Sequence, residues 1–173
     1  MRPLRSPAMS EDRPGAEDEV PPAQAAQAAL TVLHKDLGTW DTELTITPYP
    51  GAAQAVTRGV TTTRLLGGLW LVTDHETESG FVGHGIFGWD PAAGHYVATW
   101  VDSMGPGIAR GTGTWDADRR VMTYEMQVEV AGKVFRYTER MRTVEDGLHE
   151  YSNVVPVPDG EHEVIHATYR RRD

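Results

Sequence analysis

Cysteine is absent from this chain of 173 residues. Disulfides, thiolate zinc sites and cysteine nucleophiles are therefore excluded, and the absence fits a reducing compartment. Long hydrophobic runs are also absent: no stretch of about 18 apolar residues occurs, and none follows Arg2 and Arg5 as a signal peptide would require. We therefore predict a cytoplasmic protein without a membrane span.

Basic side chains are in the minority. The 16 Lys and Arg residues face 25 Asp and Glu residues, which gives a formal net charge of −9 at pH 7. Because such a charge repels phosphate backbones and anionic lipids, we expect neither nucleic acid nor a membrane as partner. The length and the hydrophobic content of 39% are typical of one globular domain with a core.

The N-terminal part of the chain divides into two segments. Residues 1–20 are rich in Pro, Glu, Asp, Arg and Ser, and we predict a disordered tail there. Residues 21–173 are predicted to form a single domain. It begins with a helix that starts at the proline pair 21–22, carries Leu30 and Leu33 on one apolar stripe, and stops at Gly38. A stripe this narrow predicts a helix lying across the mouth or flank of a sheet.

From Thr39 onward the apolar pattern has the period of two that is typical of strands. Short connections rich in Gly, Pro and Asp allow only antiparallel neighbours, and closing a sheet of roughly ten strands removes its exposed edges. We therefore predict an all-β, antiparallel up-and-down barrel of the lipocalin-like kind with one N-terminal helix; a two-sheet sandwich is the alternative. A barrel with more than about eight strands leaves interior room, so we expect a cavity. The candidate strands are Thr39–Thr47, Gln54–Leu66, Leu69–Ser79, Phe81–Trp89, His95–Ser103, Ile108–Trp115, Val121–Val130, Lys133–Thr143, Leu148–Val155 and His162–Arg171.

Four ordered motifs carry a family resemblance: LGTW at 37–40, GGLWLV at 67–72, GIFGWDPA at 85–92 and YVATWVDSM at 96–104. Through them the chain, over roughly residues 30–172, resembles the bacterial family catalogued as domain of unknown function 1579 (DUF1579). The resemblance implies a calycin-like or lipocalin-like β-barrel. Such barrels usually hold small, largely apolar molecules, and some distant relatives bind haem or catalyse cyclisations. His75 stands where the family tends to carry an aromatic residue, and we expect it to tune the pocket.

The candidate catalytic residues lie in the hairpin of residues 80–105. Glycines stud its first strand, where they usually mark a bend or a close approach. His84 lies between two of them, on the strand expected to pair with the strand of Tyr96 and Asp102. A His–Asp pair across adjacent strands could perform acid–base chemistry. We therefore name His84, Asp102 and Tyr96 as catalytic candidates. The alternatives are a structural His84 and an Asp102 that only caps the following loop.

Alternation also predicts which side chains face the interior. In Val121–Val130 the apolar residues share one parity, with Tyr124 among them. In Lys133–Thr143, Glu139 shares the apolar face with Tyr137 and Met141, where a carboxylate needs a partner or a raised pKa. Two interpretations stay open: an ion pair with an arginine at the end of the barrel, or an acid or base in the pocket. The predicted ligand-binding residues are Trp40, His75, Phe87, Trp100, Met104, Tyr124 and Glu139.

Motifs for metals and common cofactors are missing. His162 and His166 share a parity but lie more than about 12 Å apart on a strand, and no metalloprotease, calcium-loop or dinucleotide motif occurs. We predict no metal and no cofactor, although one axial histidine for haem (His149, His162 or His166) stays open as a lesser alternative.

Two classes of function remain. The first is a carrier or sensor that binds a small apolar or aromatic molecule in the cavity. The second is a cofactor-free isomerase, cyclase or lyase that uses acid–base residues of the pocket. A homodimer of barrels is compatible with either function.

Overall fold

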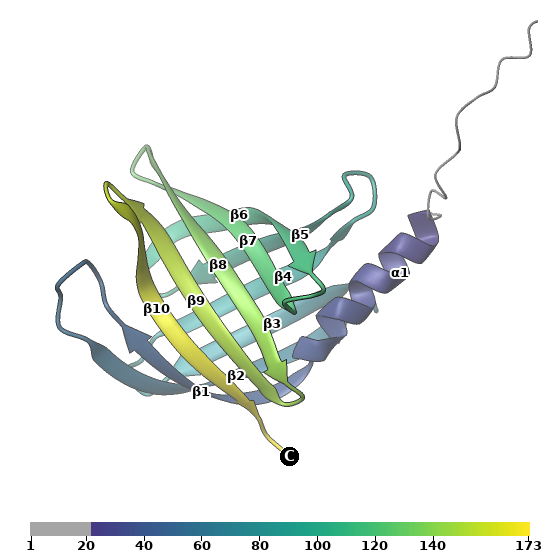
Figure 1. The fold of residues 1–173 in the computed structure, drawn as a ribbon, viewed down its shortest axis with the longest axis horizontal. Coiled ribbons are helices and arrows are strands. Elements are labelled where there is room, and N and C mark those ends of the chain that lie inside the picture. The colour runs from purple at the N-terminus through teal and green to yellow at the C-terminus, as the bar shows by residue number, and fades with distance from the viewer. Residues whose placement is uncertain (1–21) are drawn as a thin grey trace, which may run out of the picture.

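Ten antiparallel strands follow one short helix in the computed structural model, which describes residues 22–173 (Figure 1). Every strand pairs with the next one, and the first also pairs with the last, so that the sheet closes into a barrel. The predicted ten-stranded up-and-down barrel with an N-terminal helix is confirmed; the predicted disordered tail lies outside the described residues. The elements are α1 (Pro22–Leu33), the 3-10 turn η1 (His34–Asp36), β1 (Gly38–Ile46), β2 (Ala55–Leu66), β3 (Trp70–Thr77), β4 (Val82–Asp90), β5 (His95–Asp102), β6 (Gly105–Asp116), β7 (Val121–Val130), β8 (Lys133–Glu145), β9 (Leu148–Val157) and β10 (Gly160–Arg171).

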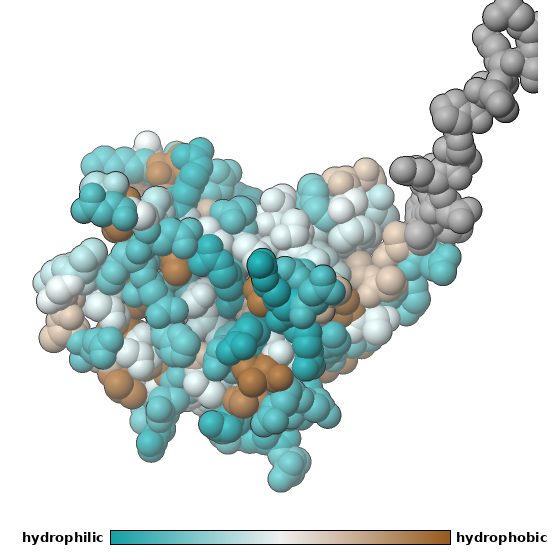
Figure 2. Space-filling model, viewed as in Figure 1, coloured by the Kyte–Doolittle hydropathy of each residue, from teal (hydrophilic) through white to brown (hydrophobic). Residues whose placement is uncertain are grey.

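Side chains alternate between the interior and the outer surface. On β7, Met122, Tyr124 and Met126 are buried while Glu125 and Gln127 are exposed, as the period of two predicts. The view in Figure 2 shows mostly hydrophilic residues over the strands, with separate hydrophobic ones among them. The core is therefore the inside of the barrel.

Helix α1 lies across one end of the barrel (Figure 1). Its buried stripe of Ala29, Leu30 and Leu33 packs on interior residues, among them Leu71 and Tyr96. The Tyr96 hydroxyl donates to the carbonyl oxygen of Ala29 at 3.4 Å. The helix is thus a cover for this end, in keeping with the position predicted from its narrow apolar stripe. No helix within residues 22–173 is long and apolar enough to cross a membrane.

The opposite end, which we call the mouth, carries five of the hairpin connections. They join β1 to β2, β3 to β4, β5 to β6, β7 to β8 and β9 to β10, at residues 47–54, 78–81, 103–104, 131–132 and 158–159. Since α1 covers only the other end, the mouth is where the interior can meet solvent.

Candidate functional site

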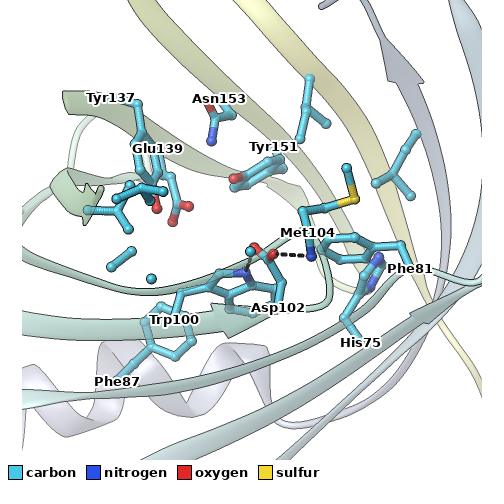
Figure 3. Close-up of a pocket in the computed structure, with 17 residues that line it drawn as sticks. His75, Phe81, Phe87, Trp100, Asp102, Met104, Tyr137, Glu139, Tyr151 and Asn153 are labelled. Atoms are coloured by element: carbon cyan, nitrogen blue, oxygen red, sulfur yellow. Dashed lines mark hydrogen bonds between the residues drawn. The ribbon is translucent and has the colours of Figure 1, made fainter. Parts of the chain in front are cut away.

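The barrel is hollow toward the mouth. A cavity of about 440 Å³, the outer chamber, takes its wall from every strand except β2 and from the connections at 78–81 and 103–104 (Figure 3). Most of this wall is aliphatic or aromatic. The lining residues are Leu44, His75, Phe81, Phe87, Trp100, Asp102, Met104, Gly105, Gly107, Ala109, Val128, Val130, Tyr137, Glu139, Tyr151, Asn153 and Ile165.

A second cavity of about 90 Å³, the inner chamber, lies closer to α1 and η1. Phe87, Glu139 and Tyr151 line both chambers and therefore form the boundary between them. The other residues of the inner chamber are Leu33, Asp36, Trp40, Thr61, Thr63, Leu71, Thr73, Met122, Tyr124, Met141, His149 and Tyr169.

Glu139 is the carboxylate at this boundary. It lies in the middle of β8, opposite Tyr124 of β7 and Asn153 of β9, and Figure 3 shows its carboxyl group pointing into the cavity. Burial raises the pKa of Glu139 to about 7, and a hydrogen bond from Tyr151 offsets part of that rise. Among residues 22–173 no ion pair includes Glu139. The interpretation that Glu139 forms an ion pair with an arginine at the end of the barrel is therefore wrong. A carboxyl group that titrates near neutral pH is suited to give or take a proton.

Tyrosines surround Glu139. Burial, and secondarily the charge of Glu139, raise the pKa of Tyr137 and Tyr151 above the usual value, so both hydroxyls stay protonated and can donate. The Tyr151 ring contacts the Tyr169 ring edge-on, with the centroids 6.2 Å apart. The predicted ligand-binding residue Tyr124 lies on the wall of the inner chamber, and its buried hydroxyl has no hydrogen-bond partner among the described residues.

Trp100 and Asp102 are joined by a hydrogen bond on the wall of the outer chamber opposite Glu139 (Figure 3). Asp102 accepts hydrogen bonds from the Trp100 indole nitrogen at 3.0 Å and from the Met104 backbone nitrogen at 2.8 Å. The indole lies against β4, where a Cβ on Gly83 or Gly85 would collide with it. The sequence interpretation of these glycines as a close approach is confirmed. Asp102 caps its turn and also lines the outer chamber.

His75 is the histidine on the wall of the outer chamber. Its side chain is buried, with Nδ1 at 2.7 Å from the Thr61 hydroxyl and the ring edge-on to Phe81. Burial lowers the pKa of His75, so the ring is neutral at neutral pH. Its Nε2 has no partner within residues 22–173.

The predicted pairing of His84 with Asp102 is wrong. The β4–β5 register places His84 opposite Val101 and Gly83 opposite Asp102, so His84 and Asp102 belong to opposite faces of the sheet. His84 Nδ1 lies 2.7 Å from an oxygen of Asp74, and 42% of the His84 side chain is exposed. The small neighbours of His84 left its face undecided in the sequence, because glycines give no apolar alternation.

The other candidates take different places. Tyr96 is buried under α1 and lines neither chamber. Trp40 lines the inner chamber, with its indole nitrogen donating to the Asp36 carbonyl oxygen at 3.0 Å. Phe87 lines both chambers, and Met104 lies at the rim with 80% exposure.

Sequence reasoning missed the lining residues Asp36, Tyr151 and Asn153, and it considered His149 only as a haem ligand. Asp36 and His149 meet at the end of the inner chamber, with Oδ1 and Nε2 3.6 Å apart. Burial raises the pKa of Asp36 to about 7 and lowers the pKa of His149 to about 4. Asp36 follows a helix and carries no periodic signal. The alternation in Leu148–Val155, by contrast, could have placed His149, Tyr151 and Asn153 on one face.

The three histidines considered for haem lie apart. His149 lines the inner chamber. His162 Nε2 lies 2.7 Å from the Thr47 carbonyl oxygen, and His166 pairs with Glu163 on an exposed surface. Within residues 22–173 no group of three or more His, Asp or Glu side chains is arranged to hold a metal ion.

Comparisons with known proteins agree with the fold and add no activity. The family model described as "Protein of unknown function (DUF1579)" matches residues 25–171, which confirms the resemblance in the motifs. No curated protein matches the chain. The crystal structure of Rv2717c from M. tuberculosis is similar with a TM-score of 0.66 and 17% identity, over 84% of this chain and 98% of that one. A redesigned β-barrel is similar only at a TM-score of 0.38 and 12% identity, over 84% of this chain and 96% of that one.

Proposed function

We propose that this chain, which belongs to the DUF1579 family of proteins of unknown function, binds a small, largely apolar or aromatic molecule as a carrier or sensor. The observation that carries this proposal is the outer chamber of about 440 Å³. Sites for small molecules are typically concave, mostly apolar, and between roughly 300 and 1,000 Å³ in volume.

The distribution of polar groups supports a ligand with one polar end. Figure 3 places Tyr137, Glu139 and Asn153 on one side of the chamber and the rings of Phe87 and Trp100 on the other. A molecule with an apolar body could lie on the rings while its polar end meets the carboxyl, amide and hydroxyl groups. A few convergent polar groups in an apolar wall usually fix orientation.

A second candidate, an isomerase, cyclase or lyase, has one observation in its favour. Glu139 has a pKa near 7 and lies beside the Tyr151 hydroxyl, which is the pairing that acid–base catalysis on a bound molecule would use. The candidate acid or base would then be Glu139 rather than His84.

Binding of N-phenyl-1-naphthylamine, a neutral fluorescent aromatic probe, tests the first function. The variant Ala109→Phe fills the chamber, because Ala109 is a buried lining residue. We expect its affinity to fall at least about tenfold relative to wild type, since the volume for an apolar body is lost.

The matched control is Ile108→Phe, the neighbouring position on β6, whose side chain is exposed and does not line the chamber. It should bind as wild type does. Val128→Phe, a lining position on the neighbouring strand β7 beside Ala109, repeats the test if the first variant fails to fold. If folded Ala109→Phe and Val128→Phe both bind the probe as wild type does, the proposal is overturned.

A further inference from the structure

We propose that the ligand of the outer chamber is an organic cation: an amine with an apolar or aromatic body, whose ammonium group sits beside Glu139 among the aromatic rings. This inference names the ligand class for the proposed binding function and rests on it. Four observations lead to it.

Carboxylates are the charged groups of the outer chamber. Glu139 and Asp102 lie in its wall, and within residues 22–173 no lysine or arginine lines it. His75, the histidine of this wall, is held in the neutral form by burial. An anionic ligand would therefore bring its charge to a wall that offers no cation, which costs free energy in a partly desolvated site.

Strand β8 carries the carboxylate Glu139 on its inner face and arginines on its outer face. Its inward positions carry Tyr137 and Glu139, whereas Arg140 and Arg142 point outward and pair with Glu161 of β10 and Glu150 of β9. The cations next to Glu139 in sequence are thus used on the outer surface. Within residues 22–173 no lysine or arginine lines either chamber, so a positive partner for ionised Glu139 would come from a bound molecule.

The two carboxylates differ in what they can still accept. Asp102 already has one donor on each oxygen, from Trp100 and Met104. Glu139 has the Tyr151 hydroxyl as its donor and retains capacity for further N–H groups, since an ionised carboxylate offers about four acceptor sites. Hydrogen bonds between an ammonium and a carboxylate are among the strong ones.

Aromatic rings also line the outer chamber. Phe87, Trp100, Tyr137 and Tyr151 all line the chamber that Glu139 faces (Figure 3). Ring faces attract cations, and the attraction grows when the cation is desolvated. A carboxylate that shares a chamber with several aromatic rings is therefore a better site for an alkylammonium than for a neutral or acidic group.

Proton release should accompany binding below neutral pH. Burial raises the pKa of Glu139 to about 7, and an adjacent cation favours the ionised form. The other titratable side chains that line the two chambers with Glu139 are Asp36 of η1, His75 of β3, Asp102 of β5, Tyr124 of β7, Tyr137 of β8, His149 and Tyr151 of β9 and Tyr169 of β10. Burial keeps the tyrosines and both histidines neutral at neutral pH, and the two aspartates are acidic, so none of these groups supplies the positive charge.

The experiment uses three probes with one shared body: 4-phenylbutylamine, 4-phenylbutanol and 4-phenylbutanoate, each displacing N-phenyl-1-naphthylamine at neutral pH. We expect the amine to bind at least about tenfold more tightly than the alcohol, and the carboxylate to bind most weakly, because only the amine brings a positive charge to the Glu139 carboxylate. The amine should also gain affinity between about pH 5.5 and 8 as Glu139 ionises.

Glu139→Gln should remove most of the preference for the amine and its pH dependence, and leave the alcohol within about threefold of wild type. Glu129→Gln, an exposed position on β7, is the control and should change nothing. Three probes with equal affinity, all weakened by Ala109→Phe, would overturn the cation inference and leave the binding function intact. If neither Ala109→Phe nor Val128→Phe, each folded, weakens the probes or N-phenyl-1-naphthylamine, the binding function itself fails.

Discussion

Glu139 is the carboxylate that lines both chambers of the barrel, and its pKa is raised to about 7. Its strand position is fixed by alternation, and its neighbours are hydroxyls rather than cations. Folding therefore moves this carboxyl group from water into a site that disfavours its charge. The consequence should be measurable in the stability of the protein without knowledge of any ligand.

We predict that Glu139→Gln is more stable than wild type above neutral pH. The pKa of Glu139 is raised from the usual 4.5 to about 7, so the carboxyl group favours folding below about pH 4.5, and that contribution is lost as the pH rises through 7. The gap between variant and wild type should widen from pH 5 to 8, by at most roughly 3 kcal/mol at 1.36 kcal/mol per pKa unit. Urea unfolding at several pH values measures it.

Glu129→Gln serves again as the control, because its side chain is exposed. Asp36 has a pKa raised in the same direction and is unchanged in both variants, so its contribution cancels in the comparison with wild type. A gap that stays constant from pH 5 to 8 would contradict the prediction and place Glu139 in a water-like environment.

At the scale of single residues, the sequence indicated which side chains face inward wherever apolar residues alternated. That was enough to place Glu139, Tyr124 and Trp100 in the interior. It was insufficient for His84, because the glycines beside it carry no hydropathy signal and the β4–β5 register decides its face. The sequence could not predict Asp36 as a site residue, because Asp36 enters the site only through the packing of η1 against the barrel.

Strand β4 is the element that shapes the outer chamber. Gly83 and Gly85 leave the space in which the Trp100 indole lies, and Trp100 in turn donates to Asp102 at the rim. The two glycines do not line the chamber themselves, but they let the lining residue Trp100 take its place in the wall. Their role follows from the tight approach of an aromatic ring and not from any unusual backbone angle.

We predict that Gly83→Ala destabilises the protein by roughly 1 to 3 kcal/mol, the usual cost of overpacking an interior. The added Cβ would collide with the Trp100 ring, whereas alanine in an unhindered strand position would be favourable relative to glycine. Urea unfolding provides the measurement. Gly105→Ala is the control, because a Cβ at Gly105 meets nothing within 4 Å. Equal stabilities of the two variants would show that Trp100 can move aside freely.

Helix α1 is the second element with a defined task, since it covers the end of the barrel beside the inner chamber. Leu33 is its most buried residue, at 2% exposure, and lines that chamber. We predict that Leu33→Ala costs about 2 to 4 kcal/mol of unfolding free energy, because it leaves a void among core residues. Gln27→Ala, on the exposed side of the same helix, should cost under about 0.5 kcal/mol. A Leu33→Ala protein as stable as its control in urea unfolding would mean that α1 is not part of the cooperative unit.

At the scale of elements, the sequence was informative because each strand ends in its own turn signal. Short hairpins dictate antiparallel neighbours, and the pairing of β1 with β10 removes the two remaining edges. The closed barrel thus follows from the local turn patterns and from the requirement that no strand edge stays unpaired. The division of its interior into two chambers did not follow, because it depends on how Phe87, Glu139 and Tyr151 meet from three different strands.

The whole molecule carries an excess of negative charge, and the mouth shares it. The net charge is −9, and the five connections at the mouth contain Glu78 and Asp159 but no Lys or Arg; Lys133 begins β8 beside them. A field of one sign around an opening raises the local concentration of oppositely charged molecules and their association rate. The effect acts over about 10 Å at 0.1 M salt, which is long enough to reach from the rim into solvent.

We therefore predict that salt slows the association of 4-phenylbutylamine and leaves that of 4-phenylbutanol unchanged. Raising the ionic strength from about 0.02 to 0.5 M shortens the screening length severalfold, so the association rate of the amine should fall by about two- to fivefold. Stopped-flow mixing of the protein with N-phenyl-1-naphthylamine and the competitor together measures both association rates, because the two molecules then compete for the same site. Glu139→Gln should keep the salt dependence, because one interior carboxyl group contributes little to the field outside, even though it sets the affinity. If Glu139→Gln abolished the salt dependence, the attraction would come from that single carboxyl group and the acidic mouth would have no part in it.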